Sequence, residues 1–375
     1  MQYNEVMQNI YQAKGTTLIE QYRDVGRLFG KNIQESVNKL SKKRAKLTVI
    51  RRQVAEKSWT YIQDKKECSE FRECLSAWAR GAEITNEQAM WLLADNLSGC
   101  QSFIARYGSG VALLHTEEEF IDNEHIELHM SDPMTIAFEE PSGRSCTLVY
   151  NNLMPGCGLY GFKSGLITAI DTLFVKENGV AEVERPVLVN MISWMIWRMK
   201  PEEAEPNNIV EMINSLGELI DGYAINVVRK VGEVCEGYKL TLARSESKIE
   251  MLGETPSDYL AQTNLIDPKY PPMLWATPPR QIWRGGYRYF LHRYKTMASH
   301  AKMYQKYLIQ SLNSRGILQV HKTIHKTILY DLKEAYVNKD LGAVCVGLID
   351  KNGTSVSAKK NDENFEEIEY LELFN

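Results

Sequence analysis

The hydrophobic period of this chain changes at one junction, Gly99-Cys100. Before the junction, apolar residues recur at steps of three and four, which is typical of amphipathic helices. After it, short apolar runs alternate with turn residues, which is typical of strands and hairpins. The sequence therefore predicts that Cys100 lies at the start of a strand that follows an almost wholly helical segment, residues 1–97.

The helical part shows clear boundaries. Its apolar spacing predicts one helix over Leu18 to Leu40, another over Glu70 to Gly81, and a third that opens at a capping sequence beginning with Thr85. Gly26 and Gly30 lie on one face of the first helix, where glycine lets another element approach closely. No set of residues in this part has the types and spacing of a catalytic or ligand-binding site.

The remaining residues predict a mixture of strands and helices. The strands are expected at 101–107 and 111–115 around the turn Gly108-Ser109-Gly110, at 135–138 and 146–150, as two short strands within 160–170, and at 224–228, 238–242, 327–330, 344–348 and 369–373. Helices are expected at 186–199, 206–220 and 282–312. This order of helices, strands, helices and strands fits the α+β class, with layers of sheet covered by helices.

Composition excludes several classes of protein. Of the 375 residues, 44% are hydrophobic and 25% charged, as in an ordinary globular protein. The net charge of −4 gives no reason to expect nucleic acid or a membrane as a partner. We expect neither a signal segment at the N-terminus nor a membrane span. Seven scattered cysteines without a C-x-x-C pair argue against disulfides and zinc, so a cytoplasmic setting is expected.

A cysteine placed directly after a glycine at a strand start can attack the preceding carbonyl. The Gly99–Cys100 amide would become a thioester, which water cleaves, and glycine leaves that attack unobstructed. Cleavage would give Cys100 a free α-amine, with a pKa of about 7.7–8, which can serve as general base for its own thiol. On this residue pair alone, a buried structural cysteine is the more common interpretation.

Motifs spread over most of the chain resemble those of the acyl-coenzyme A:6-aminopenicillanic acid acyltransferase family, within the linear-amide hydrolases of the N-terminal-nucleophile class. Gly99-Cys100 resembles the family's cleavage site, with Ser102 where the family has a hydroxyl residue. The other similar stretches are Gly26–Gly30, Leu75–Thr85, His115–Glu118, Lys163–Leu166, Thr263-Asn264 and Thr327–Lys333.

The resemblance implies a fold and a set of roles. It implies a four-layer αββα sandwich in which residues 1–99 form a helical pro-segment or small subunit and residues 100–375 the catalytic subunit. Cys100 would be the nucleophile, Glu118 the acid that orients its amine, and Asn264 an oxyanion donor. Ser102 would assist catalysis, and Arg284 and Arg288 are candidates for substrate binding.

The implied activity is autocatalytic cleavage of a precursor, followed by amide hydrolysis or acyl transfer through an acyl-Cys100 thioester. The substrate would be a small acyl amide or acyl thioester, bound to coenzyme A or to a carrier. No metal or organic cofactor is implied, and the resemblance is compatible with a homo-oligomer. Sequence does not separate hydrolase from transferase, because water exclusion is a property of the assembled pocket.

Four positions depart from the family pattern. The usual Asn-Glu-Asp is Thr116-Glu117-Glu118, an asparagine is replaced by Lys163, and the histidine after Asn264 is Leu265. These changes motivate a second hypothesis, a non-catalytic member that stays uncleaved and binds a ligand or protein partner.

The site residues also have ordinary structural interpretations. These are a solvated acidic turn for Glu118, a turn former for Asn264, a backbone cap for Ser102, and surface ion pairs for Arg284 and Arg288. The pairs His125/His129 and His321/His325 lack the pattern of a zinc protease, and Ser109 lies in a hairpin turn rather than in a nucleophile elbow.

Overall fold

The computed structural model describes residues 10–43, 46–94, 99–118, 133–158, 160–173, 182–220, 222–243, 246–255, 258–262, 341–360 and 369–373. The described helices are α1 (Leu18–Lys42), α2 (Lys46–Ile62), the 3-10 turn η1 (Lys66–Cys68), α3 (Ser69–Gly81), α4 (Asn86–Ala94), α5 (Val189–Arg198) and α6 (Pro206–Leu216). The expected helix over 282–312 and strand over 327–330 lie outside the described residues.

Most of the described strands belong to two large sheets. The first, of eight strands, has the order β1 (Ile10–Gln12), β4 (Met134–Glu140), β5 (Gly143–Val149), β6 (Tyr160–Lys163), β7 (Leu166–Leu173), β10 (Gly222–Val231), β11 (Val234–Ala243) and β12 (Glu246–Met251). The second, of six strands, has the order β13 (Tyr259–Gln262), β2 (Gly99–Tyr107), β3 (Gly110–Glu118), β14 (Leu341–Asp350), β15 (Gly353–Lys360) and β16 (Glu369–Leu373).

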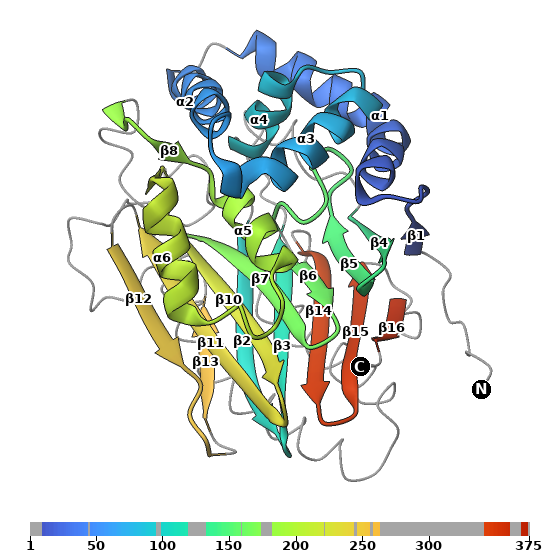
Figure 1. The fold of residues 1–375 in the computed structure, drawn as a ribbon, viewed down its shortest axis with the longest axis vertical. Coiled ribbons are helices and arrows are strands. Elements are labelled where there is room, and N and C mark those ends of the chain that lie inside the picture. Colours follow the sequence, from blue (N-terminus) through green and yellow to red (C-terminus); the bar gives the residue numbers. More distant parts are fainter. Residues whose placement is uncertain are drawn as a thin grey trace.

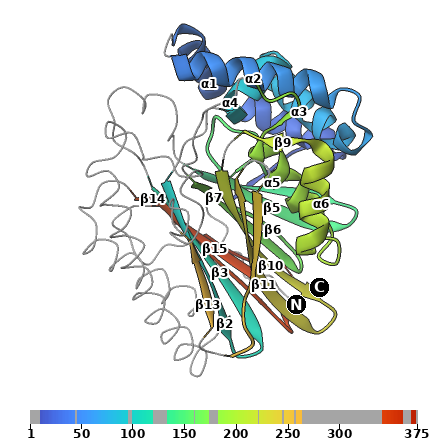
Figure 2. The same cartoon turned by 90° about the vertical axis from the view of Figure 1, so that its left-hand side faces the viewer.

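The two large sheets pack against each other, and helices cover one end and one face (Figures 1 and 2). The phenol of Tyr160 in β6 donates to the backbone oxygen of Leu113 in β3, at 3.3 Å. A Cβ built at Gly237 of β11 would meet the side chain of Ile104 in β2. Helix α5 packs on β6 and β7 on the other side of the eight-stranded sheet. The chain therefore has the α+β organisation expected from its sequence.

The N-terminal helices follow the sequence prediction closely. At the start of α1, the Thr17 hydroxyl accepts from the backbone N–H of Glu20, and the Glu20 carboxylate accepts from that of Thr17, a capping box that fixes the first turn. Thr85 and Gln88 make the same pair of bonds before α4. Both predicted helix starts are confirmed, and so is the helix ending at Gly81.

Helices α1 and α3 pack backbone against backbone. A Cβ built at Gly26 would lie well under 3.0 Å from the carbonyl oxygen of Trp78, and one built at Gly81 would meet that of Arg23 in the same way. Only glycine fits at such a crossing. The close approach predicted for Gly26 is confirmed, whereas a Cβ at Gly30 would find an ordinary contact 3.7 Å from the Cα of Ala82.

Two predicted helices are shorter than expected. Helix α5 begins at Val189 rather than at Pro186, because Pro186 and Val187 form β8 (Pro186–Val187), which pairs in parallel with β9 (Glu218–Leu219). Helix α6 stops at Leu216 because Gly217 adopts a φ of 154°, which a helix cannot contain. Periodicity alone did not reveal this two-stranded sheet, whose strands are two residues long.

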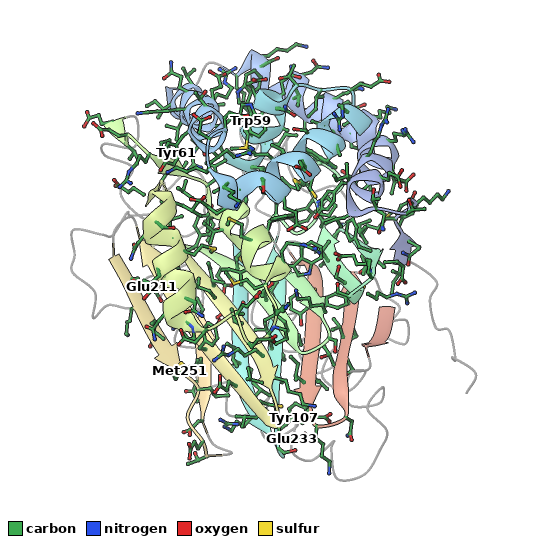
Figure 3. All side chains as sticks on the ribbon, viewed as in Figure 1. Trp59, Tyr61, Tyr107, Glu211, Glu233 and Met251 are labelled. Carbon is green, nitrogen blue, oxygen red and sulfur yellow. The ribbon has the colours of Figure 1, made fainter. Side chains whose placement is uncertain are left out.

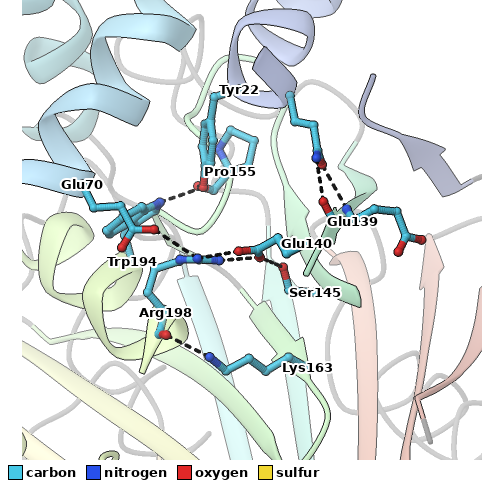
Figure 4. A network of polar contacts seen from close by, with 10 residues as sticks. Tyr22, Glu70, Glu139, Glu140, Ser145, Pro155, Lys163, Trp194 and Arg198 are labelled. Carbon is cyan, nitrogen blue, oxygen red and sulfur yellow. Dashed lines mark hydrogen bonds and ion pairs between the residues drawn. The ribbon is translucent and has the colours of Figure 1, made fainter. Parts of the chain in front are cut away.

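The helical segment is firmly joined to the rest of the chain. Strand β1 pairs with β4, and the side-chain amide of Gln21 exchanges two hydrogen bonds with the backbone of Glu139, at 2.7 and 3.0 Å. The buried phenol of Tyr22 donates to the carbonyl oxygen of Pro155 and accepts from the indole N–H of Trp194 (Figure 4). These contacts hold residues 10–43 and 46–94 as an integral layer of the fold.

Candidate active site around Cys100

Cys100 is the second residue of β2, at the end of the strand nearer the helices. Tyr107, the last residue of β2, lies at the opposite end, beside the turn that carries Glu233 (Figure 3). Strand β2 is an inner strand, flanked by β13 and β3. The side chain of Cys100 is buried, with 1% of its surface exposed. The prediction that this cysteine begins a strand of the first hairpin is confirmed.

The register of the hairpin identifies the neighbours of Cys100. Glu117 of β3 lies directly opposite Cys100, and Glu118 lies directly opposite Gly99. Successive residues of a strand face opposite sides, so Cys100, Ser102 and Ile104 share one face. Ile104 contacts β11 of the other sheet, which shows that this face points into the space between the two sheets.

A chain of buried polar side chains crosses between the sheets two residues after Cys100. The hydroxyl of Ser102 lies 2.8 Å from Nδ1 of His115, which is its direct partner on β3. The same nitrogen lies 3.9 Å from Oδ1 of Asp171 on β7, and the amide of Asn226 on β10 donates to Oδ2 of Asp171 at 2.6 Å. None of the four side chains is more than 1% exposed.

This arrangement is not a catalytic Ser-His-Asp triad. In a triad the base uses one ring nitrogen for the serine and the other for the carboxylate. Here Ser102 and Asp171 both approach Nδ1 of His115. The chain of contacts instead ties β2 and β3 to β7 and β10, and so fixes the position of the strand that carries Cys100.

Sequence reasoning found half of this network. Ser102 is a predicted site residue and His115 begins a motif, whereas no motif includes Asp171 or Asn226. Asp171 interrupts the otherwise apolar or hydroxyl-bearing strand Leu166–Leu173, and a lone carboxylate in a buried strand is a signal that could have identified it.

The other predicted site residues are only partly covered by the described structure. Glu118 lies on the strand paired with that of Cys100, as expected. Asn264, Arg284 and Arg288 lie outside the described residues. Strand β13 ends at Gln262, which lies opposite Ser102, two positions before Asn264 in the sequence.

All seven cysteines are free and buried. Burial raises the pKa of Cys68 to about 11 and also raises the pKa of four other thiols, those of Cys74, Cys146, Cys157 and Cys235. A thiol with a raised pKa is a poor nucleophile at neutral pH. The raised pKa values argue against a nucleophilic role for these five cysteines.

Lys163, where the resembling family has asparagine, belongs to a different cluster of polar contacts. Its amine donates to the backbone oxygen of Arg198 at 2.9 Å (Figure 4). The guanidinium of Arg198 binds the carboxylate of Glu140 through two nitrogens and also reaches Glu70. Burial, and then repulsion by Arg198, lowers the pKa of Lys163 to about 8.

The lowered pKa predicts an effect on stability at alkaline pH. Below pH 8 the Lys163 amine carries its charge in both folded and unfolded chains, so its burial disfavours folding. Between pH 8 and the ordinary value of 10.5 the folded chain releases the proton first, and this cost disappears. We expect the free energy of unfolding of the wild type to rise relative to that of Lys163→Met across this window. Denaturant unfolding at pH 7, 8, 9 and 10 measures the difference, and a constant difference would contradict the assignment.

The described residues hold neither a metal-binding cluster nor a membrane-spanning helix. They contain no group of three or more histidine, cysteine, aspartate or glutamate side chains arranged to hold a metal ion. No helix among them combines the length and apolar character needed to cross a membrane.

Comparison with known proteins gives no further guide to function. No protein-family model matches the chain, and no curated protein sequence is significantly similar to it.

Proposed function

We propose that the protein is a self-cleaving N-terminal-nucleophile enzyme in which Cys100 is the nucleophile. The observation that carries the proposal is the position of Cys100, on an inner strand of one antiparallel sheet and on the face turned toward a second sheet. A helical segment leads into this strand, and Gly99 directly precedes the thiol. With an outer helical layer on the six-stranded sheet, this arrangement would be the four-layer αββα sandwich that the sequence motifs imply.

The first reaction is cleavage of the chain. The thiol of Cys100 attacks the carbonyl carbon of Gly99, the C–S bond forms as the C–N bond breaks, and the thiol proton passes to the released amine. Water then cleaves the thioester, giving a carboxylate at Gly99 and a free thiol and α-amine at Cys100. With a pKa of about 7.7–8, that amine can act as the general base in later turnovers.

The second reaction acts on a small acyl amide or acyl thioester. The Cys100 thiol forms a thioester with the acyl group as the C–N or C–S bond of the substrate breaks, and the thiol proton, carried by the α-amine, passes to the amine or thiol that leaves. Water or an amine then attacks this thioester, and the Cys100 thiol is released. Glu118 would hold the α-amine, and Asn264 would donate to the oxyanion, an interaction worth roughly 2.7–4 kcal/mol in other enzymes. Arg284 or Arg288 would bind the substrate, and Ser102 would hold the strand in place through His115. Residues 1–99 would stay bound as a small subunit.

A second candidate function is ligand or partner binding by an uncleaved chain. One observation favours it: the amine of Lys163, at a position where the resembling family has asparagine, is bonded to the Arg198 backbone as part of a structural cluster. The departures at Thr116 and Leu265 point the same way.

A thiol-directed acyl probe distinguishes the two functions. We expect a β-lactone probe to label the purified wild type once per chain, to label Cys235→Ala equally, and to leave Cys100→Ala unlabelled. Labelling would be read by mass spectrometry of peptides. Equal labelling of wild type and Cys100→Ala would contradict the enzymatic proposal and favour the binding protein.

A further inference from the structure

We propose that Arg51 and Asn190 form a clamp on the last turn of α4 that controls self-cleavage at Gly99–Cys100. The clamp couples cleavage to the docking of the helical segment on α5, so that only a correctly assembled chain is cut. This inference rests on the proposed function and adds its regulation.

The clamp acts on backbone groups that a helix leaves without partners. The last four carbonyl groups of an α-helix have no intrahelical donor. In α4, the carbonyl oxygen of Leu93 accepts from the side-chain amide of Asn190 at 2.6 Å. That of Ala94, the last helical residue, accepts from Nη1 of Arg51 at 2.7 Å. Both bonds are buried.

The two donors come from opposite sides of the proposed cut. Arg51 belongs to α2, within residues 1–99, and Asn190 belongs to α5, within residues 100–375. Helix α4 contacts both α2 and α5 (Figure 1). The Arg51 bond lies within the helical segment, whereas the Asn190 bond to Leu93 forms only when that segment is packed against the remainder of the chain.

Asn190 lowers the stability of the fold at this position. Its side chain is 1% exposed, and its Oδ1 has no hydrogen-bond partner among the described residues. A buried acceptor left in this way costs stability. The Asn190 side chain therefore does not serve mainly to stabilise the fold; the contact that it makes is the hydrogen bond to Leu93.

The clamp lies close to the scissile bond along the chain. Ala94 precedes Gly99 by five positions, a span of about 17 Å at full extension. On the other side, pairing with Glu117 and the Ser102–His115 contact hold the strand of Cys100. Attack requires the sulfur and the carbonyl carbon to approach within about 3–3.5 Å, and a misplacement of about 1 Å can cost a hundredfold in rate. The scissile bond is thus held on one side by the clamped end of α4 and on the other by the strand of Cys100. Breaking the bond to Leu93 or Ala94 releases the first of these.

The test is the first-order rate of self-cleavage of newly made full-length chains. Chains are synthesised in a cell-free system, chased for increasing times, denatured and analysed by mass spectrometry for fragments of 99 and 276 residues, the latter being 375 minus 99. The variants are Asn190→Leu, Arg51→Met and Arg51→Lys, which keeps a donor. Gln21→Leu is the matched control, because it removes bonds between the same two parts of the chain that do not involve α4. Thermal midpoints are measured for each variant in a Cys100→Ala background.

We expect Asn190→Leu to slow cleavage at least about tenfold, although its thermal midpoint falls no further than that of Gln21→Leu. Arg51→Lys should cleave faster than Arg51→Met, since its amine can still bind Ala94. Cleavage of Asn190→Leu at the wild-type rate would overturn the clamp while leaving the proposed function intact. If the wild type itself remained uncut, both the proposed function and the clamp would be overturned.

Discussion

Gly26→Ala is expected to destabilise the protein by about 3 kcal/mol, although alanine is the better helix former by about 1 kcal/mol. The reason is the crossing of α1 and α3. The new Cβ would overlap the carbonyl oxygen of Trp78, and every atom that it meets belongs to the backbone of α3 or its C-cap. Neither helix can yield without separating from the other. Urea unfolding followed by circular dichroism measures the loss.

Gly30→Ala is the matched control and should change stability in the opposite direction. Its Cβ would lie 3.7 Å from the Cα of Ala82, an ordinary contact, on the same face of the same helix. We expect a gain of about 0.5–1 kcal/mol from helix propensity. Equal effects at the two positions would show that α1 and α3 do not cross at Gly26.

Glu140→Leu is expected to cost about 3 kcal/mol, at the lower end of the range for breaking a buried ion pair. Glu140 accepts from Arg198 at 2.5 and 2.6 Å, and their side chains are only 10% and 16% exposed. The guanidinium also lies over the rings of Trp194 and Trp197. Removing the carboxylate leaves Arg198 with Glu70, whose side chain is 54% exposed, as its remaining acidic partner among the described residues.

The double variant Glu140→Leu/Arg198→Met separates the pair from general packing. Because it leaves no unpaired charge, we expect it to cost less than Glu140→Leu alone. The pH dependence provides a second readout. Burial alone would raise the pKa of Glu140, but the hydrogen bond and charge of Arg198 lower it overall. The pair's contribution is thus present above the ordinary value of 4.5 and is lost as the pH falls through the lowered value. If the stability costs of Glu140→Leu and Arg198→Met add up to the cost of the double variant, the two side chains are not coupled.

Local sequence signals predicted the elements near the junction well. The capping sequence at Thr85, the glycine turn at Gly108–Gly110 and the period of α1 are each determined by neighbouring residues, and each is confirmed. The expectation for Gly26 succeeded for the same reason, since a glycine on an otherwise buried helix face signals close approach. Gly81, its counterpart on α3, marks the predicted end of that helix, and its contact with the Arg23 carbonyl is not predicted.

Long-range pairing was harder to predict. Strand β1 is three residues long and forms because β4 offers it a partner more than a hundred positions later. The pairs Ser102–His115 and Asp171–Asn226 are each cross-strand neighbours, but nothing local indicates that the two pairs meet. The roles of Arg51 and Asn190 could not be predicted either, because their partners are backbone carbonyls, which every residue carries.

The most direct test of the account is the intact mass of the purified protein under denaturing conditions, measured beside Cys100→Ala. The account predicts fragments of 99 and 276 residues from the wild type, the latter being 375 minus 99, and a single full-length chain from the variant. An uncut chain of 43.0 kDa from both proteins would contradict it.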